Sequence, residues 1–327
     1  MSDMARLRLA NQQITVHPHT SASDVVTAFG AMQAQDYRNA LWAVGLRLHK
    51  ATASDIELAL ASSTLVRTWA LRGTLHLVAA QDVRWVLDLV APSVIAQSTG
   101  RLRQLGIDDI ALRASRAVLE QALSDGGRLT RADALALLDR AGIETTGQRG
   151  IHILRQLSLK GLLVQTVEVG RQTTFALLDA VVPRAPALSR EEALAELAWR
   201  YFSSHGPATV RDFAWWSGLP AAEARAGTEL AASRLAGERI GDAVHWMPVS
   251  PSAPPSIERV AWVLPAFDEY ILGYAERRVA LDPVACARIV ANGLFPPPSC
   301  APVAPSAPGG PAMGRRPRPL RSFLVGR

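Results

Sequence analysis

Two glutamines stand two positions apart in the stretch "AMQAQDYRNALW" (residues 31–42), where a helical pattern ends. Residues at i and i+2 point to opposite sides of a helix but to the same side of an extended chain. Gln33 and Gln35 therefore converge only if the backbone between the flanking helices is extended. A glutamine side chain has no accessible pKa and cannot act as a general base. Taken alone, the pair indicates either polar helix-end residues or two amides that hold a common partner.

Basic residues form a second set of candidates, on segments that could touch a nucleic acid. In "TLVRTWALRGTLHLV" (64–78), we expect Arg67, Arg72 and His76 to project from a hairpin, either toward phosphates or as ordinary surface residues. In "QRGIHILRQLSLKG" (148–161), a helix could enter a DNA groove, or it could be a solvated face. The candidates for DNA contact are Arg38, Arg67, Arg72, His76, Arg149, His152, Arg155 and Lys160.

The elements that position these residues read as helices with small hairpins between them. Helical patterns cover 4–12, 22–32, 37–48 and 54–62, and a period-two pattern then follows around "RGT". Three helices followed by a hairpin are the order of a winged helix. The fold class is therefore mainly α with small β-hairpins (α+β).

The same order of elements recurs twice along the chain. Helices at 81–97, 109–124 and 147–160 precede strands at 162–168 and 172–177, and a helix at 190–204 opens a third unit whose hairpin turns at Gly241-Asp242. Thr130 is predicted to cap a helix, with Asp133 closing a capping box. We predict winged helices at 1–80, 81–184 and 185–250, a C-terminal segment at 257–295, and a tail at 296–327.

Composition limits the classes of partner and site. The net charge of +6 suggests an anionic partner, but five arginines of the acid-free tail leave only +1 for the rest of the chain. The two cysteines and the scattered histidines lack metal-ligand spacing, and "SDGGRLT" lacks the lysine of a phosphate loop. We expect no metal, no cofactor, no membrane span and no secretory signal, hence a cytoplasmic, nucleoid-associated protein and a monomer.

Three stretches carry a family resemblance, namely "MQAQDYRNALWAVGLRL" (32–48), "TLVRTWALRGTLHLV" (64–78) and "LPAFDEYILGY" (264–274). In this order they resemble the winged-helix family of AlkZ-like and YcaQ-like bacterial DNA glycosylases, over about residues 5–295. The hallmark of that family is a Gln–apolar–Gln or Gln–apolar–Asp motif, which Gln33-Ala34-Gln35 matches. The resemblance implies three tandem winged helices curved into a C around DNA, with Gln33 and Gln35 as catalytic residues.

The implied activity is removal of alkylated purines from double-stranded DNA, including bulky or crosslinked N7-guanine adducts. Alkylation at N7 makes the purine cationic and hence a good leaving group, so no general acid is needed. Two amide oxygens could hold the attacking water and face the oxocarbenium-like sugar. Lys50 and Lys160 are the only lysines, so a monofunctional glycosylase without a Schiff-base step is expected. The alternatives are a non-catalytic DNA-binding protein or regulator, and a paralogue that has lost activity.

The tail departs from the family pattern. After "RRVALDPVACARIVANGLF" (277–295) the family continues with a strand-rich segment, whereas this chain is rich in Pro, Ala and Arg. Such a composition predicts disorder. With 33 arginines to two lysines, it also suggests GC-rich coding and a shifted reading frame from about residue 296.

Overall fold

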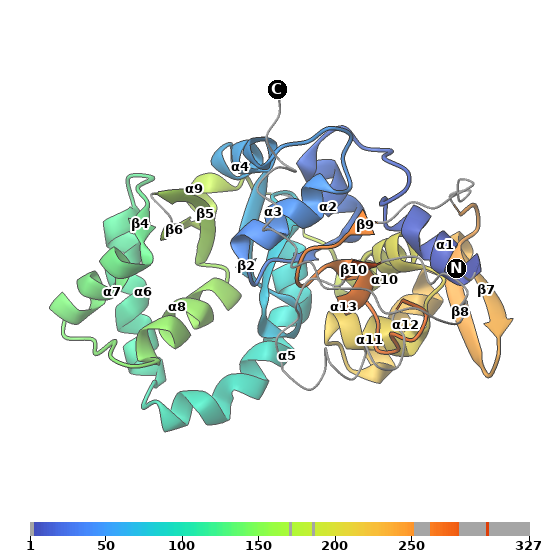
Figure 1. Cartoon of the computed structure of the whole chain (residues 1–327). Helices are drawn as coiled ribbons and strands as arrows, with labels where there is room; N and C mark the ends of the chain where they lie inside the picture. Colours follow the sequence, from blue (N-terminus) through green and yellow to red (C-terminus); the bar gives the residue numbers. More distant parts are fainter. Residues whose placement is uncertain (1–2, 170–171, 185–186, 252–261, 281–298, 301–327) are drawn as a thin grey trace, which may run out of the picture.

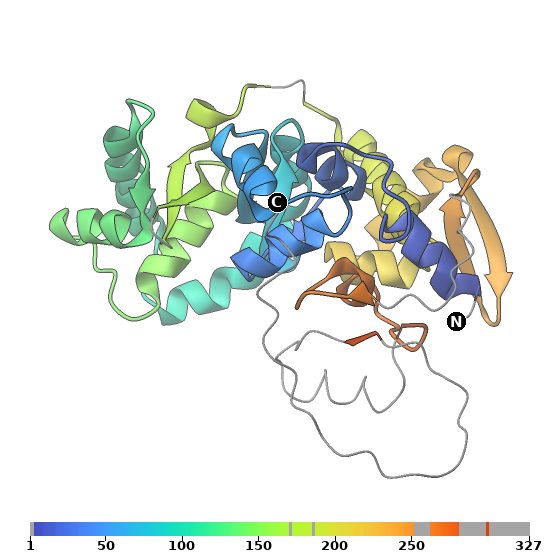
Figure 2. The ribbon, with the colours of Figure 1, turned by 45° about the horizontal axis from the view of Figure 1, so that its top comes forward.

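The computed structural model describes residues 3–169, 172–184, 187–251, 262–280 and 299–300. Helices dominate, and antiparallel hairpins lie between them, as the sequence predicts (Figure 1). We call the elements of residues 3–79, 83–182 and 190–248 the first, second and third units. Figures 1 and 2 both show the first unit in the middle, with the second and third units on opposite sides of it.

The first unit contains the segment with the two glutamines. Its elements are α1 (Asp3–Asn11), α2 (Ala22–Phe29), β1 (Met32–Gln33), α3 (Tyr37–Gly45), α4 (Ala53–Ala61), β2 (Leu65–Trp69), the 3₁₀ turn η1 (Leu71–Gly73) and β3 (Leu75–Ala79). Helix α2 ends three residues earlier than predicted, because Gly30 has a φ of 80° and stops the helix. This early end releases the chain into the short strand β1, which the sequence pattern did not predict.

The second unit places a long helix next to the first hairpin. It contains α5 (Val83–Gln104), α6 (Asp109–Leu123), β4 (Leu129–Thr130), α7 (Arg131–Arg140), α8 (Arg149–Leu159), β5 (Leu163–Val169), β6 (Gln172–Leu177) and α9 (Leu178–Val181). Helix α5 extends seven residues beyond its predicted end at residue 97. Thr130 caps α7, and its hydroxyl accepts a hydrogen bond from the Asp133 N–H at 3.1 Å. The predicted reciprocal bond is replaced by one from the Thr130 hydroxyl to the Asp133 carboxylate.

The third unit repeats this helix start and is followed by the C-terminal segment. The elements are α10 (Arg190–His205), α11 (Val210–Ser217), α12 (Ala221–Leu230), η2 (Ala232–Arg234), β7 (Leu235–Ile240), β8 (Ala243–Pro248), β9 (Trp262–Val263), α13 (Glu269–Leu272) and β10 (Ser299–Cys300). Thr209 and Asp212 form a complete capping box at α11. The predicted disordered tail lies outside the described residues, apart from Ser299–Cys300, which pair with β9.

The hairpins of the first two units join in one sheet. Six strands follow the order β1-β3-β2-β5-β6-β4, and β2 meets β5 where Arg67 is paired with Gln165. The third hairpin, β7-β8, is a separate two-stranded sheet. Because β2 and β3 lie inside the larger sheet, every residue of both strands is buried.

The C-terminal segment is anchored on the first unit by a buried ion pair. Arg47, just after α3, donates from Nη1 and Nη2 to the two carboxylate oxygens of Asp268, at 2.8 and 2.9 Å, and both side chains are fully buried. Arg47 Nη2 also donates to Gln12 Oε1, at 2.9 Å. Apolar contacts support the anchor, since Leu9, Leu264 and Ile271 belong to one buried cluster.

Replacing Asp268 with Asn should destabilise the protein strongly. The substitution leaves the Arg47 guanidinium buried without its carboxylate, a change that typically costs about 3–5 kcal/mol. Urea denaturation at pH 7 measures the free energy of unfolding. As a control, Glu276→Gln removes an exposed carboxylate of the same segment and should change that free energy by less than about 0.5 kcal/mol. Equal effects of the two substitutions would contradict the anchoring role.

Candidate active site

Gln33 and Gln35 lie between two helices, Gln33 in the short strand β1 and Gln35 at the bend that follows it. Gln33 is paired with His76 in the antiparallel ladder of β1 and β3, and the Ala34 N–H donates to the Leu75 carbonyl at 2.7 Å. Helix α3 begins soon afterwards, because the Asp36 side chain accepts from the Asn39 N–H. The backbone is therefore extended at Gln33, continues one ladder hydrogen bond further at Ala34, and bends at Gln35.

Gln33 is held from both ends. Its backbone N–H donates to Glu269 Oε1 at 2.7 Å, and its side-chain Oε1 accepts from Arg72 Nη2 at 2.8 Å. A guanidinium can only donate hydrogen bonds, so the amide oxygen, and not the amide nitrogen, must face Arg72. The orientation of this half-buried side chain is thus set by its chemistry.

Gln35 is exposed and is oriented by the backbone of β3. Its Oε1 accepts from the Leu75 N–H at 3.3 Å, which again fixes the oxygen side of the amide. Each amide oxygen of the pair then has one partner and one further lone pair. Both glutamines can accept a second hydrogen bond, for example from a water molecule.

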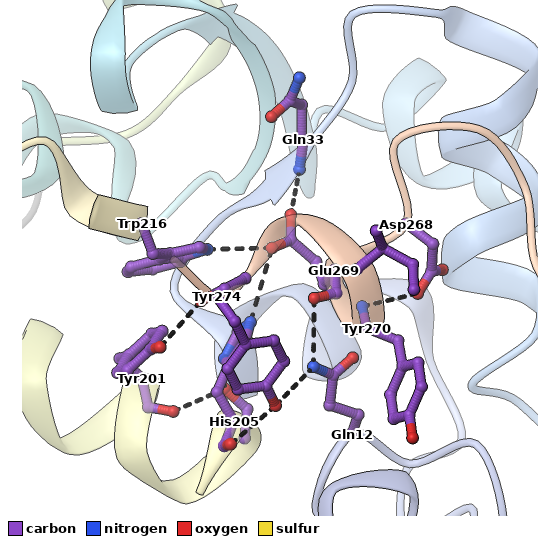
Figure 3. A network of polar contacts seen from close by, with 12 residues as sticks. Gln12, Gln33, Tyr201, His205, Trp216, Asp268, Glu269, Tyr270 and Tyr274 are labelled. Atoms are coloured by element: carbon purple, nitrogen blue, oxygen red, sulfur yellow. Dashed lines mark hydrogen bonds and ion pairs between the residues drawn. The ribbon is translucent and has the colours of Figure 1, made fainter. Parts of the chain in front are cut away.

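Glu269 lies below Gln33 in Figure 3, with its carboxylate directed at the Gln33 backbone. The residue is almost fully buried, at 2% exposure. Its Oε2 accepts from Trp216 Nε1 at 2.9 Å and lies 3.5 Å from His205 Nε2. Burial raises the pKa of this carboxyl, but His205 and the Gln33 N–H lower it more, to about 2. Glu269 is therefore an anion at neutral pH.

Arg72 connects the first unit to the third. It occupies the tip of the β2–β3 hairpin with a φ of 53°, and it donates to the main-chain oxygens of Trp215 and Trp216 at the end of α11. Gly218 lies against it, and a Cβ on that glycine would come within 3.0 Å of Arg72 Cγ. Burial lowers the pKa of Arg72, and the nearby Glu269 opposes that effect.

The structure contradicts the prediction that Arg67, Arg72 and His76 project from a free hairpin toward DNA. His76 has no exposed surface, and Arg67 is 6% exposed and donates to Ala34 O at 2.9 Å and Gln165 Oε1 at 2.6 Å. The reason is the joined sheet, in which β1 and β5 pair with the two edges of this hairpin, and every residue of β2 and β3 is buried. The guanidinium groups of Arg67 and Arg72 instead hold the glutamine segment, because Arg67 donates to the carbonyls of Ala34 and Gln35, and Arg72 donates to Gln33 Oε1.

His76 is a neutral imidazole in this setting. Burial, and then the positive charge of Arg72, lower its pKa to about 4. Its Nδ1 lies 3.0 Å from the Thr74 carbonyl, which can only accept, so the proton is on Nδ1. Nε2 is then an acceptor without a partner among the described residues.

The arginines of helix α8 also turn inward. Arg149 donates to the carbonyls of Leu105 and Glu144, and Arg155 donates to Ser98 Oγ at 3.0 Å and Gly73 O at 3.3 Å. His152 is half-buried, and burial lowers its pKa. Helix α8 packs against α5, so its predicted use as a groove-binding helix loses much of its support. Arg38 and Lys160 are exposed, and their contacts with DNA stay predictions.

Sequence reasoning missed the roles of Glu269, Trp216 and Arg47 at this site. The stretch "DEYILGY" was informative only as a family signature, although a Glu in an apolar run is itself a signal of a buried, paired carboxylate. Among the described residues, no group of three or more His, Cys, Asp or Glu side chains could hold a metal ion. In the same part of the chain, no helix is long and apolar enough to cross a membrane.

Comparisons with known proteins relate the chain to a family and a fold. The profile of the family "DNA glycosylase AlkZ-like" matches residues 26–301. The "Interstrand DNA cross-link repair glycosylase" of Streptomyces sahachiroi is 28% identical over 228 residues, which are 65% of this chain and 59% of that protein, less than two thirds of its length. The solved structure of "Streptomyces sahachiroi DNA glycosylase AlkZ" superposes with a TM-score of 0.74 at 23% identity, over 90% of this chain and 83% of that one. This likeness shows the fold.

The neutral state of His76 predicts a pH dependence of stability. Between pH 6.5 and about 4 the unfolded chain binds a proton that the folded protein does not. The contribution of His76 to stability is therefore present above pH 6.5 and is lost as the pH falls toward 4. His76→Asn removes the titrating group but keeps a donor for Thr74.

This substitution should flatten the fall in the free energy of unfolding between pH 6.5 and 5, as measured by urea denaturation. His49→Asn, which removes an exposed imidazole, serves as the control. If the two variants and the wild type have the same slope, the neutral state of His76 is contradicted.

Proposed function

The chain belongs to the DNA glycosylase AlkZ-like family, and on that basis we propose that it hydrolyses the N-glycosidic bond of alkylated purines in duplex DNA. The observation that carries the proposal is the pair of amide oxygens on Gln33 and Gln35. The Arg72 guanidinium donates to the Gln33 oxygen, and the Leu75 backbone N–H donates to the Gln35 oxygen, so the orientation of each amide is fixed. Each oxygen keeps one free lone pair. In this proposal the protein acts as a monomer, without metal or cofactor, on DNA in the cytoplasm.

The chemistry needs few groups from the protein. An N7-alkylated purine is cationic and leaves with its bonding electron pair, which generates an oxocarbenium-like sugar. A water molecule held by the amide oxygens of Gln33 and Gln35 is positioned to trap this sugar. The partial negative charge of the two oxygens stabilises the cation as it develops. Both lysines are exposed and away from the motif in sequence, which favours a monofunctional enzyme.

The exposure of Gln35 bears on the size of the substrate. An exposed catalytic residue does not require the damaged base to enter an enclosed pocket. The curated relative is named for interstrand cross-link repair, and a crosslinked base cannot be fully extruded into a pocket. We therefore infer that bulky or crosslinked N7-guanine adducts are within the substrate range of this protein.

Substitution of either glutamine should abolish most of the base release. Gln33→Ala and Gln35→Ala each remove one oxygen that holds the water and faces the sugar, and loss of one such group typically costs about 10²–10³-fold in rate. The measurement is the single-turnover rate of abasic-site formation in a duplex that contains N7-methylguanine. The spontaneous loss of the base, without protein, is subtracted.

The exposed Gln97 on α5 provides the matched control, because Gln97→Ala also removes one amide. It should release base at the wild-type rate. Binding to the damaged duplex without any release above the spontaneous rate would instead support a non-catalytic DNA-binding protein on this scaffold. Equal rates for wild type and both motif variants would contradict the catalytic role of the glutamines.

Arg38 should contribute to DNA affinity through charge alone. Its side chain is exposed on α3, three residues after Gln35, and Arg38→Ala should reduce the salt dependence of binding by about one unit of slope. Fluorescence anisotropy of a labelled duplex at several salt concentrations measures this slope. Arg116→Ala is the control, because that guanidinium pairs with Glu120 on α6. An unchanged slope for Arg38→Ala would remove Arg38 from the interface.

A further inference from the structure

We propose that Glu269 is the positioning residue for Gln33, so that the reaction depends on a carboxylate that does not touch the substrate. The inference rests on the proposed function and deepens it. Glu269 lies 236 positions from Gln33 in sequence, yet the two residues share a hydrogen bond of 2.7 Å. Among the residues that the structure describes, the Glu269 carboxylate is the side-chain acceptor of the Gln33 backbone N–H.

The two carboxylate oxygens of Glu269 match the two hydrogen-bond donors that face them. Oε1 accepts from the Gln33 N–H, and Oε2 accepts from Trp216 Nε1. The isosteric glutamine has one acceptor oxygen for these two donors, and its NH₂ group would face one of them. Glu269→Gln therefore breaks one of the two contacts without changing the volume of the side chain.

Opposite charges act on the two ends of Gln33. The anionic Glu269 binds its backbone N–H, and the cationic Arg72 binds its side-chain oxygen. The two charged groups are also close enough to influence each other, because Glu269 opposes the loss of the proton from buried Arg72. Loss of the Glu269 charge would thus loosen the backbone of Gln33 directly and its side chain through Arg72.

Glu269 itself is held rigidly, as a positioning residue must be. Its own carbonyl accepts from Gln12 Nε2 at 3.3 Å, and the preceding residue, Asp268, forms the buried pair with Arg47. The ring of Trp216 is fully buried behind it. Figure 3 shows Glu269 at the centre of these contacts, with Gln33 on one side and Trp216 and His205 on others.

A double-mutant cycle tests the proposal. Glu269→Gln should lower the single-turnover rate of base release by about 10–100-fold, the range expected when a catalytic group is displaced by up to 1 Å. The dissociation constant for the damaged duplex should stay the same. In the Gln33→Ala background, Glu269→Gln should cause no further loss, because the two residues act as one unit. Equal losses in both backgrounds would overturn the proposal.

A second measurement does not depend on activity. In a sample with ¹⁵N-labelled glutamine, the Gln33 amide proton should be shifted downfield by its charged acceptor, and Glu269→Gln should move it upfield. Glu276→Gln, which removes an exposed carboxylate of the same segment, should change neither this signal nor the rate. If the Gln33 signal is the same in wild type and Glu269→Gln, the positioning role is wrong.

The two measurements separate failure of this inference from failure of the proposed function. If the wild-type protein releases no base from any alkylated duplex, the proposed glycosylase activity is disproved. The predicted effect of Glu269 on the rate of base release is then disproved as well. The Gln33 signal would still show whether Glu269 holds that residue. A wild-type protein that releases base, with Glu269→Gln fully active, would overturn the inference and leave the glycosylase intact.

Discussion

The buried pair of Arg47 and Asp268 is the interaction on which the rest of the site depends. It ties a segment near the end of the described chain to the helices of the first unit, and it is stabilised by two charge-assisted hydrogen bonds in a site without water access. A buried pair of this kind adds little net stability compared with apolar packing, but it specifies one arrangement. Here that arrangement brings Glu269 beneath Gln33.

The candidate site is assembled from parts that are far apart in sequence. The glutamines come from β1 and the turn after it, Arg72 comes from a hairpin tip, and Glu269 comes from α13. In the third unit, the carbonyls of Trp215 and Trp216 accept from Arg72, and the Trp216 indole donates to Glu269. The site therefore exists only when the first and third units and the C-terminal segment are docked together.

Local signals in the sequence predicted the elements well, because helix caps and turns are decided within a few residues. The hairpins and the start of α7 at Thr130 are of this kind. The sequence did not predict that β2 would pair with β5. A period-two pattern indicates that a segment is a strand, but it does not indicate which other strand pairs with it. For the same reason Arg67 and Arg149 were expected to face DNA. An arginine suits a phosphate and a main-chain carbonyl equally, and only the fold decides between them.

The strand pairing between the first two units has a mechanical consequence. Arg67 donates both to the carbonyl of Ala34, inside the glutamine motif, and to Gln165 of the second unit. Its strand β2 is paired with β5 of the second unit. The first and second units are therefore joined by strand pairing as well as by the connecting chain, and they form one surface. In the function proposed above, a straight duplex that meets such a surface supplies the deformation itself, and bending a site of 20–30 base pairs costs of the order of 1–6 kcal/mol. For the glycosylase proposed above, damage that already softens or kinks the duplex lowers that cost, so a joined protein surface favours damaged sites over intact ones.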